Sequence, residues 1–182
     1  MATWKSRGLR GSTFEDFINQ TNEIYKEKHL GLIQKIPTPI TPIQIDEQSR
    51  HITLAYFDQK STVDYIGVVQ GIPVCFDAKE CTKQTFPLAN IHQHQMEFMR
   101  DFEQQEGIAF FLIYFTEENK YYYLSYKEAL FFWNRMEKGG RKSFKMDELK
   151  ESFFFEFMPT YPVPYLNMIQ KDLDERNIDS NR

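Results

Sequence analysis

The sequence lacks the features of secreted, fibrous and membrane-embedded proteins. Its two cysteines, Cys75 and Cys81, form neither a CxxC pair nor a zinc-binding pattern, so we expect reduced thiols. Eight glycines and eight prolines are too few for a fibrous or low-complexity chain. The first residues contain no apolar stretch typical of a signal peptide, and no run of about 18 apolar residues predicts a transmembrane helix. We therefore expect a cytoplasmic protein that makes no membrane contact.

Positive charge is also scarce, because the formal net charge is −4 whereas nucleic-acid-binding domains are usually basic. The basic residues are, however, concentrated in two places. One is the N-terminal segment before the first acidic residue, and the other is the stretch 134–145. Such patches can bind DNA phosphates with an affinity that falls steeply as salt rises. We predict DNA contacts in both: Arg7, Arg10, Lys138, Arg141 and Lys142.

The spacing of apolar residues predicts a single α/β domain over 1–182, with a mixed central sheet flanked by helices. The expected helices span 12–28, 89–106 and 126–136, and a short helix follows residue 164. The expected strands span 30–36, 62–69, 73–79, 108–115 and 121–124, with a further strand over 153–158. Residues 138–142 are predicted to form a flexible basic loop, and residues 172–182 a flexible tail.

Three prolines follow the first predicted strand. Pro37, Pro39 and Pro42 exclude both a helix and a central strand. From there to Lys60, apolar and polar residues alternate weakly. We therefore predict an extended, two-stranded projection over 37–60, with its turn near Asp46–Arg50.

Two carboxylates and a lysine lie on neighbouring predicted strands. Asp77 and Lys79 share one face of their strand, because alternate residues point the same way. Asp64 on the preceding strand could reach the same point across the hairpin. Two carboxylates suit Mg²⁺, with Mn²⁺ as a possible substitute, and a lysine could stabilise charge on a phosphate undergoing attack. A solvated strand face would carry the same residues, but apolar neighbours favour a site.

Four further polar residues are candidates for the same site. Gln95 interrupts the apolar stripe of a predicted helix, so it either satisfies buried backbone or points into the site. His92 and His94 should lie on different sides of that helix, which argues against joint zinc binding. One of them could contact DNA or be purely structural. Glu15 could supply another carboxylate, or it could close a capping box with Ser12.

Seven segments occur in a fixed order along most of the chain: Arg10–Asp16 (RGSTFED), Lys35–Pro39 (KIPTP), Ser61–Gly67 (STVDYIG), Phe76–Glu80 (FDAKE), Phe86–Leu88 followed by His92–Gln95, Phe132–Trp133, and Gly140–Ser143 (GRKS). Together they resemble the sequences of RecU-type Holliday junction resolvases of Gram-positive bacteria. One departure is Asp77, which stands where glutamate is also found in that family.

The resemblance implies a PD-(D/E)XK nuclease fold in which the 37–60 projection is a stalk. It implies a homodimer whose two active sites resolve four-way DNA junctions by paired symmetric nicks during recombination and repair. It places a metal site at Thr62, Asp64, Asp77 and Gln95, with Lys79 stabilising the transition state. Glu15 is our additional catalytic candidate. We also expect DNA contacts from Lys35 and Arg50, at the entry and turn of the stalk, and from His92.

The expected partners are junction DNA, a second copy of the chain, a RecA-type recombinase and a branch-migration helicase. Two other functions remain open. A non-catalytic junction-binding scaffold could share the fold, although it would not need Asp64, Asp77 and Lys79. A sequence-specific nuclease of the restriction type could share the core, although the proline-led projection favours junction binding.

Overall fold

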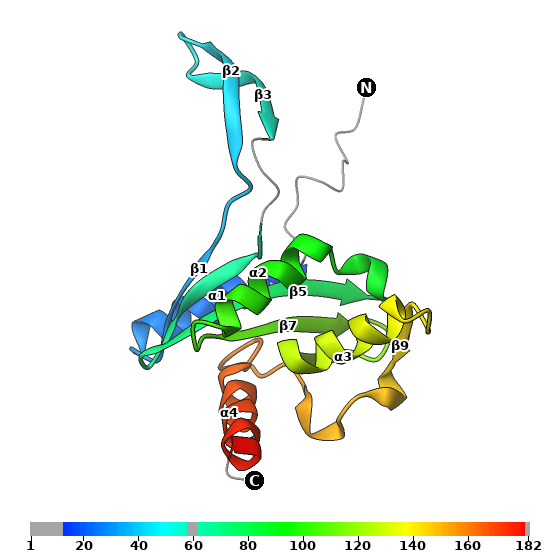
Figure 1. The fold of residues 1–182 in the computed structure, drawn as a ribbon. Coiled ribbons are helices and arrows are strands. Elements are labelled where there is room, and N and C mark those ends of the chain that lie inside the picture. The colour runs from blue at the N-terminus through cyan, green and yellow to red at the C-terminus, as the bar shows by residue number, and fades with distance from the viewer. Residues whose placement is uncertain (1–12, 58–61, 181–182) are drawn as a thin grey trace.

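A six-stranded mixed sheet forms the centre of the computed structural model, which describes residues 13–57 and 62–180 (Figure 1). The strand order is β1-β4-β5-β7-β8-β10, in which β5 and β7 are parallel and all other neighbours antiparallel. The mixed α/β fold predicted from the sequence is confirmed. The strands are β1 (Leu32–Lys35), β4 (Tyr65–Val69), β5 (Ile72–Cys81), β7 (Ile108–Phe115), β8 (Lys120–Ser125) and β10 (Phe154–Phe155).

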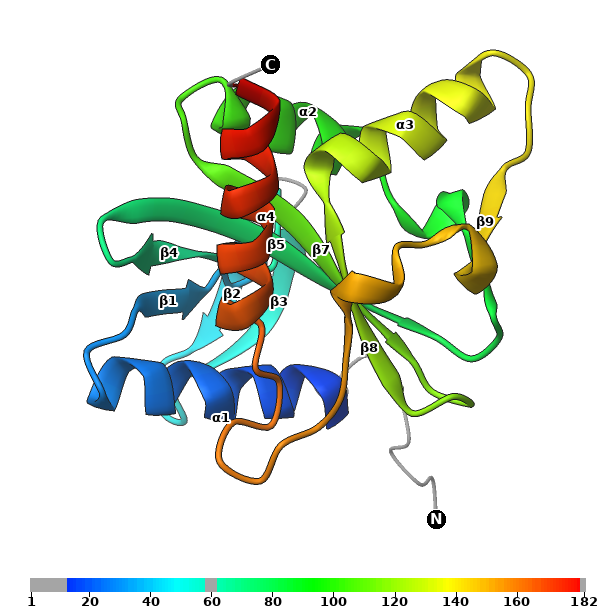
Figure 2. The same ribbon diagram turned by 90° about the horizontal axis from the view of Figure 1, so that it is seen from below.

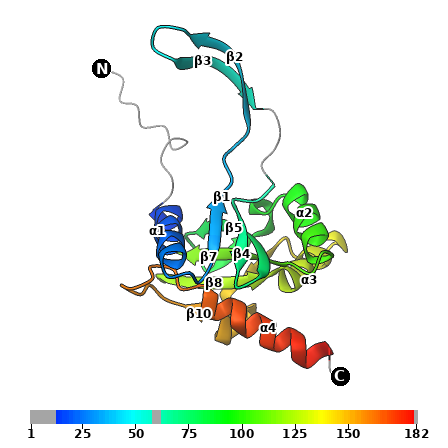
Figure 3. The ribbon, with the colours of Figure 1, turned by 90° about the vertical axis from the view of Figure 1, so that its left-hand side faces the viewer.

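Both faces of this sheet are covered, which explains why β7 is an almost continuous apolar run. Helix α1 (Thr13–Glu27) covers one face, where Phe14 stacks on Tyr121 with ring centroids 5.2 Å apart. Helices α2 (Gln93–Glu103) and α3 (Tyr126–Glu137) lie on the other face (Figure 3). Within the described residues, no helix is both long and apolar enough to span a membrane.

The predicted projection is a β-hairpin that stands away from the sheet (Figures 1 and 3). Strands β2 (Ile40–Asp46) and β3 (His51–Phe57) pair only with each other. Asp46 shapes the turn, since its carbonyl oxygen accepts the Arg50 N–H at 2.8 Å and its carboxylate accepts the Gln48 N–H at 3.1 Å. The predicted turn is therefore confirmed, and residues 58–60 of the predicted projection lie outside the described residues.

A second small sheet and three 3₁₀ turns were not predicted. Strands β6 (Thr85–Pro87) and β9 (Ser143–Lys145) pair antiparallel, and Phe86 stacks on Phe144 between them at 5.0 Å. Three-residue strands are too short to show an alternating pattern. The 3₁₀ turns are η1 (Leu88–Asn90), η2 (Met146–Glu148) and η3 (Glu151–Phe153). Because η1 occupies the start of the helix expected over 89–106, α2 begins only at Gln93. The strand expected over 153–158 is reduced to β10.

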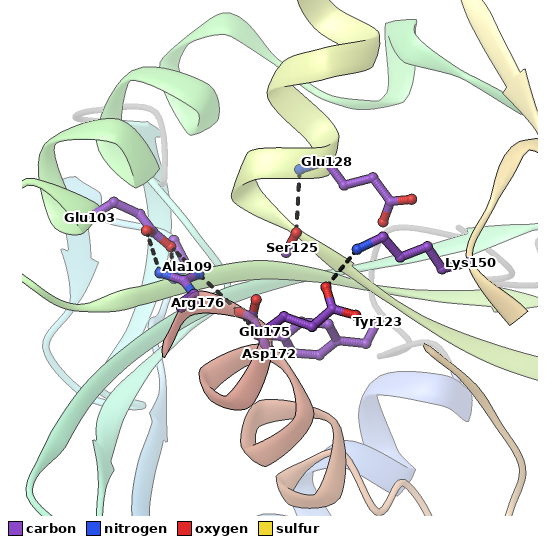
Figure 4. Close-up of polar contacts among 9 residues, drawn as sticks. All are labelled: Glu103, Ala109, Tyr123, Ser125, Glu128, Lys150, Asp172, Glu175 and Arg176. Carbon is purple, nitrogen blue, oxygen red and sulfur yellow. Dashed lines mark hydrogen bonds and ion pairs between the residues drawn. The ribbon is translucent and has the colours of Figure 1, made fainter. Parts of the chain in front are cut away.

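The expected flexible tail over 172–182 is wrong for its described part. Helix α4 (Leu166–Ser180) crosses the strands of the sheet (Figure 2). Asp172 is 6% exposed and accepts a hydrogen bond from the Tyr123 hydroxyl at 2.9 Å. Arg176 donates to both carboxylate oxygens of Glu103, at 2.7 and 2.8 Å, and to Asp172 at 2.9 Å (Figure 4). Glu103 also accepts the Ala109 N–H, so the network joins α4, α2 and β7.

We predict that Arg176→Gln lowers the free energy of unfolding by about 2 to 3 kcal/mol, because it leaves the buried Asp172 and the half-buried Glu103 without their cation. Urea unfolding followed by circular dichroism would measure this loss. The matched control is Arg100→Gln, which removes an exposed ion pair with Asp101 and should change stability by less than about 0.5 kcal/mol. Equal effects of the two changes would show that the network does not hold α4.

Candidate active site

Two polar residues of β5 face α2. Asp77 is 1% exposed, and the Lys79 ammonium nitrogen lies 2.5 Å from its Oδ1. Phe76, the residue before Asp77, lies on the opposite face of the strand, where its ring stacks on Tyr65 with centroids 4.6 Å apart. The predicted division of β5 into a polar face and an apolar face is therefore confirmed.

Asp64 meets these residues from the neighbouring strand. It immediately precedes β4, whose first residue Tyr65 pairs with Phe76 in the antiparallel register, so Asp64 lies opposite Asp77. Its Oδ2 accepts the Ala78 N–H at 2.9 Å. Its backbone carbonyl oxygen accepts the Ile36 N–H at 2.7 Å, which ties the base of the hairpin to the site.

Gln95 lies at the start of α2. Its sequence position predicted either a hydrogen bond to buried backbone or a side chain that points into the site, and the structure shows both. Its Nε2 donates to Asp77 Oδ2 at 2.5 Å, so the side chain does point into the site. Its Oε1 accepts the backbone N–H of His92 at 3.0 Å, so the same amide also satisfies backbone. These two bonds fix the orientation of the amide with its nitrogen toward Asp77. Direct ligation of a metal by Oε1 requires the amide to turn.

The environment of Asp77 favours its protonated form in the absence of a metal. Burial raises the pKa of Asp77 from 3.8 to about 7, the Lys79 ammonium opposes this rise in pKa, and the neighbouring Asp64 carboxylate adds to it. A carboxylate held at this pKa is typical of a functional site, because a purely structural carboxylate is seldom buried beside another.

An open cleft of about 420 Å³ lies at this end of β5. It is lined by Glu15, Lys79 and His92, each of which was predicted from the sequence as a candidate site residue. Glu15 also forms an ion pair with Lys35, at the entry to the hairpin. Glu80 and Asn90 line the cleft too and were not predicted, although Glu80 belongs to the FDAKE segment. The complete lining is Glu15, Ala78, Lys79, Glu80, Ala89, Asn90 and His92.

We expected the two histidines to lie on different sides of a helix, and this expectation is wrong. Their rings stack with centroids 5.4 Å apart and planes 14° from parallel. The reason is that His92 precedes the helix and has an extended backbone, with φ −96° and ψ 149°. Helical spacing therefore does not apply to the pair.

The remaining predicted residues lie outside the carboxylate cluster. Thr62 is half-buried and lies two residues before Asp64. Arg50 is in the hairpin turn with φ +55°, and Arg7 and Arg10 are outside the described residues. Lys138, Arg141 and Lys142 are exposed between α3 and β9, where Arg141 lies 3.3 Å from Glu148.

The residues present fit a magnesium ion. Within the described residues, the buried Oδ1 of Asp77 has no hydrogen-bond donor in good geometry, although the Lys79 ammonium is close. Asp64 and Asp77 both offer carboxylate oxygens, which are the ligands that Mg²⁺ prefers. In the described part of the chain, no group of three or more His, Cys, Asp and Glu residues is arranged to hold a metal ion by itself. Two carboxylates suit an ion that completes its shell with water and phosphate, as Mg²⁺ does.

Two carboxylates and a lysine on adjoining strands of a mixed sheet, beside an open cleft, are the arrangement of a nuclease-type α/β enzyme. The family model described as "RecU: Recombination protein U" matches residues 9–171 of the chain. The chain therefore belongs to the RecU family of recombination proteins.

Curated relatives extend this comparison. The chain is 38% identical over 172 residues to the Holliday junction resolvase RecU of Pediococcus pentosaceus, covering 92% of this chain and 86% of the relative. It is 42% identical over 167 residues to the protein of the same name from Oceanobacillus iheyensis, with coverages of 89% and 85%. The solved structure of the Holliday junction resolvase Hjc from Archaeoglobus fulgidus is 11% identical, with coverages of 81% and 91%. Its TM-score of 0.41 is too low to bear on the assignment.

The raised pKa of Asp77 predicts a pH-dependent effect of Asp77→Asn on the metal-free protein. Because the folded pKa is above the unfolded one, the stability that Asp77 contributes is complete below about pH 3.8 and lost as pH rises through about 7. Between about pH 5 and pH 8, the variant should therefore gain on the order of 2 kcal/mol relative to the wild type. Urea unfolding in EDTA at both pH values measures this. A difference independent of pH would contradict it.

Proposed function

We propose that this chain is a Mg²⁺-dependent endonuclease that resolves Holliday junctions by paired symmetric nicks. Membership of the RecU family supports the resolvase activity and the role in recombination. The Mg²⁺ dependence and the cleavage chemistry are supported by the convergence of Asp64, Asp77 and Lys79 beside a cleft at the base of the hairpin.

The roles of the residues follow from their positions. Asp64 and Asp77 would hold the ion, with Thr62 and a turned Gln95 amide as further oxygen donors. Bound Mg²⁺ would polarise the scissile phosphate and lower the pKa of a water molecule that attacks it. Lys79 is already adjacent to Asp77, so its ammonium can stabilise the negative charge that builds up on the phosphate. Glu15 lines the same cleft and could orient the attacking water.

The hairpin supports a two-fold dimer. Its large apolar residues are unusually exposed for a protein surface, between 46% and 77%, and Ile45 lies directly opposite Ile52. Burial of these side chains against a second copy, or against the open centre of a junction, would remove them from water. A two-fold dimer also matches two symmetric nicks. The exposed set is Ile40, Ile43, Ile45, Ile52, Leu54, Tyr56 and Phe57.

A junction-binding scaffold without catalysis is the alternative. A scaffold would gain nothing from a carboxylate buried as completely as Asp77, because an ionised group in that position lowers stability. The buried Asp77 therefore favours the enzyme. A RecA-type recombinase and a branch-migration helicase stay predicted partners.

Asp77→Asn should abolish junction cleavage while leaving junction affinity within a few fold, because it removes a metal-binding oxygen but no phosphate contact. We would measure cleavage of a labelled mobile four-way junction and of matched duplex in Mg²⁺, Mn²⁺ and EDTA. Binding would be measured separately in EDTA. The matched control is Asp147→Asn, at an exposed carboxylate, which should cut normally.

The outcomes separate the candidate functions. Symmetric nicks in the junction alone, lost in EDTA, would support the proposal. Tight binding without nicks in either metal would favour the scaffold, and equal cutting of duplex would favour a general nuclease. Normal cleavage by Asp77→Asn would refute the assignment of the site.

We predict that the double change Ile45→Gln and Ile52→Gln weakens self-association at least about ten-fold, because it removes two apolar side chains from the proposed interface. Sedimentation velocity over a concentration series would measure the dissociation constant. Val68→Gln changes a similarly exposed residue of β4 and should have little effect. A hairpin variant that associates as tightly as the wild type would place the dimer interface elsewhere.

A further inference from the structure

The basic segment, residues 138–145, follows α3. Its first residues were predicted to form a flexible loop, but hydrogen bonds fix them at the end of the helix. Gly139, with φ +84°, donates its N–H to the Met136 carbonyl oxygen, and Gly140 donates to the Arg135 carbonyl oxygen, each at 2.9 Å. This pair of bonds is a Schellman motif. A Cβ on Gly140 would lie 2.7 Å from the Arg135 carbonyl oxygen, so only glycine fits. The path of the basic segment is therefore set where it leaves the helix.

Glu148, in η2, follows the basic segment in sequence, and its carboxylate contacts several of the basic residues. Its carboxylate pairs with the Arg135 guanidinium, lies 3.3 Å from Arg141 Nη1 and accepts the Lys145 N–H at 2.9 Å. Arg135 in turn donates to the Ser143 carbonyl oxygen at 2.7 Å. One carboxylate thus connects both arginines to the backbone of β9.

The same segment lies beside the cleft. Strand β9 pairs with β6, and the Lys142 carbonyl oxygen accepts the Leu88 N–H at 3.0 Å. The next two residues, Ala89 and Asn90, line the cleft. A DNA strand in the cleft would therefore continue past the basic segment.

We propose that Glu148 is a positioning residue that holds the Arg141 guanidinium in place to contact a backbone phosphate of a duplex arm. This inference rests on the proposed function. An acidic side chain among phosphate-binding cations repels DNA, so by charge alone it should weaken binding. We infer that Glu148 instead strengthens DNA binding through its three contacts. The Arg141 guanidinium is already fixed in place, so it loses less side-chain entropy when it binds phosphate.

The two explanations predict opposite changes in DNA affinity when Glu148 is replaced by glutamine. Glu148→Gln adds one positive charge, so charge alone predicts tighter DNA binding. The positioning role predicts weaker binding, about two- to eight-fold at about 0.1 M salt, where eight-fold is the loss of one phosphate contact. The slope of log affinity against log salt should fall by up to about one, the change expected when a single phosphate contact is lost.

Asp147→Asn is the matched control, because it adds the same charge one residue away. Asp147 is exposed and makes no hydrogen bond or ion pair within the described chain. Its variant should bind DNA as tightly as the wild type or slightly tighter. Binding to a synthetic four-way junction and to duplex would be measured by fluorescence anisotropy in EDTA, with thermal melting as a check on folding.

A double-mutant cycle makes the result independent of a general loss of stability. If Glu148 acts through Arg141, Glu148→Gln should weaken binding no further in the Arg141→Gln background. Tighter binding by Glu148→Gln, matching Asp147→Asn, would overturn the inference, as would additive losses in the cycle. Failure of the wild type to bind or cut junctions would instead refute the proposed function.

Discussion

The burial of the Asp77 carboxylate is the constraint on which the rest of the site depends. A carboxylate that is 1% exposed must be charge-paired, hydrogen-bonded or protonated. The fold provides a partner from each neighbouring element: Lys79 from the same strand, Gln95 from α2 and Asp64 from beside β4. Each of these side chains is therefore already positioned around Asp77 before any substrate or metal binds.

This constraint also explains the arrangement of the helices. Gln95 can reach Asp77 only if α2 begins close to β5, and η1 with the extended His92 brings it there. The opposite end of α2 is held through Glu103, which accepts the Ala109 N–H at the start of β7 and pairs with Arg176 of α4. The C-terminal helix therefore holds in place the helix that contacts the buried carboxylate, although it lies outside the cleft.

Much of the fold and site could be predicted from local patterns. The hairpin followed from three prolines and the chemistry of its turn, and the polar face of β5 followed from the alternation of side chains along a strand. The errors arose where contacts distant in sequence decide the structure. The order of α4 depends on Glu103, Tyr123 and Asp172 together, and the stacking of His92 on His94 depends on a helix start set by η1. Glu148 escaped notice because charge counts do not show which cations share a carboxylate.

The hydrogen bond from the Ile36 N–H to the Asp64 carbonyl oxygen makes the hairpin and the site parts of one mechanical unit. With seven residues in each strand, at about 3.3 Å each, the hairpin is roughly 23 Å long, and the chain enters it just after Ile36. Any displacement of the chain that reaches Ile36 therefore also reaches the backbone of Asp64. A different hairpin grafted onto this core would for the same reason have to preserve the Ile36 hydrogen bond, even with every site residue retained.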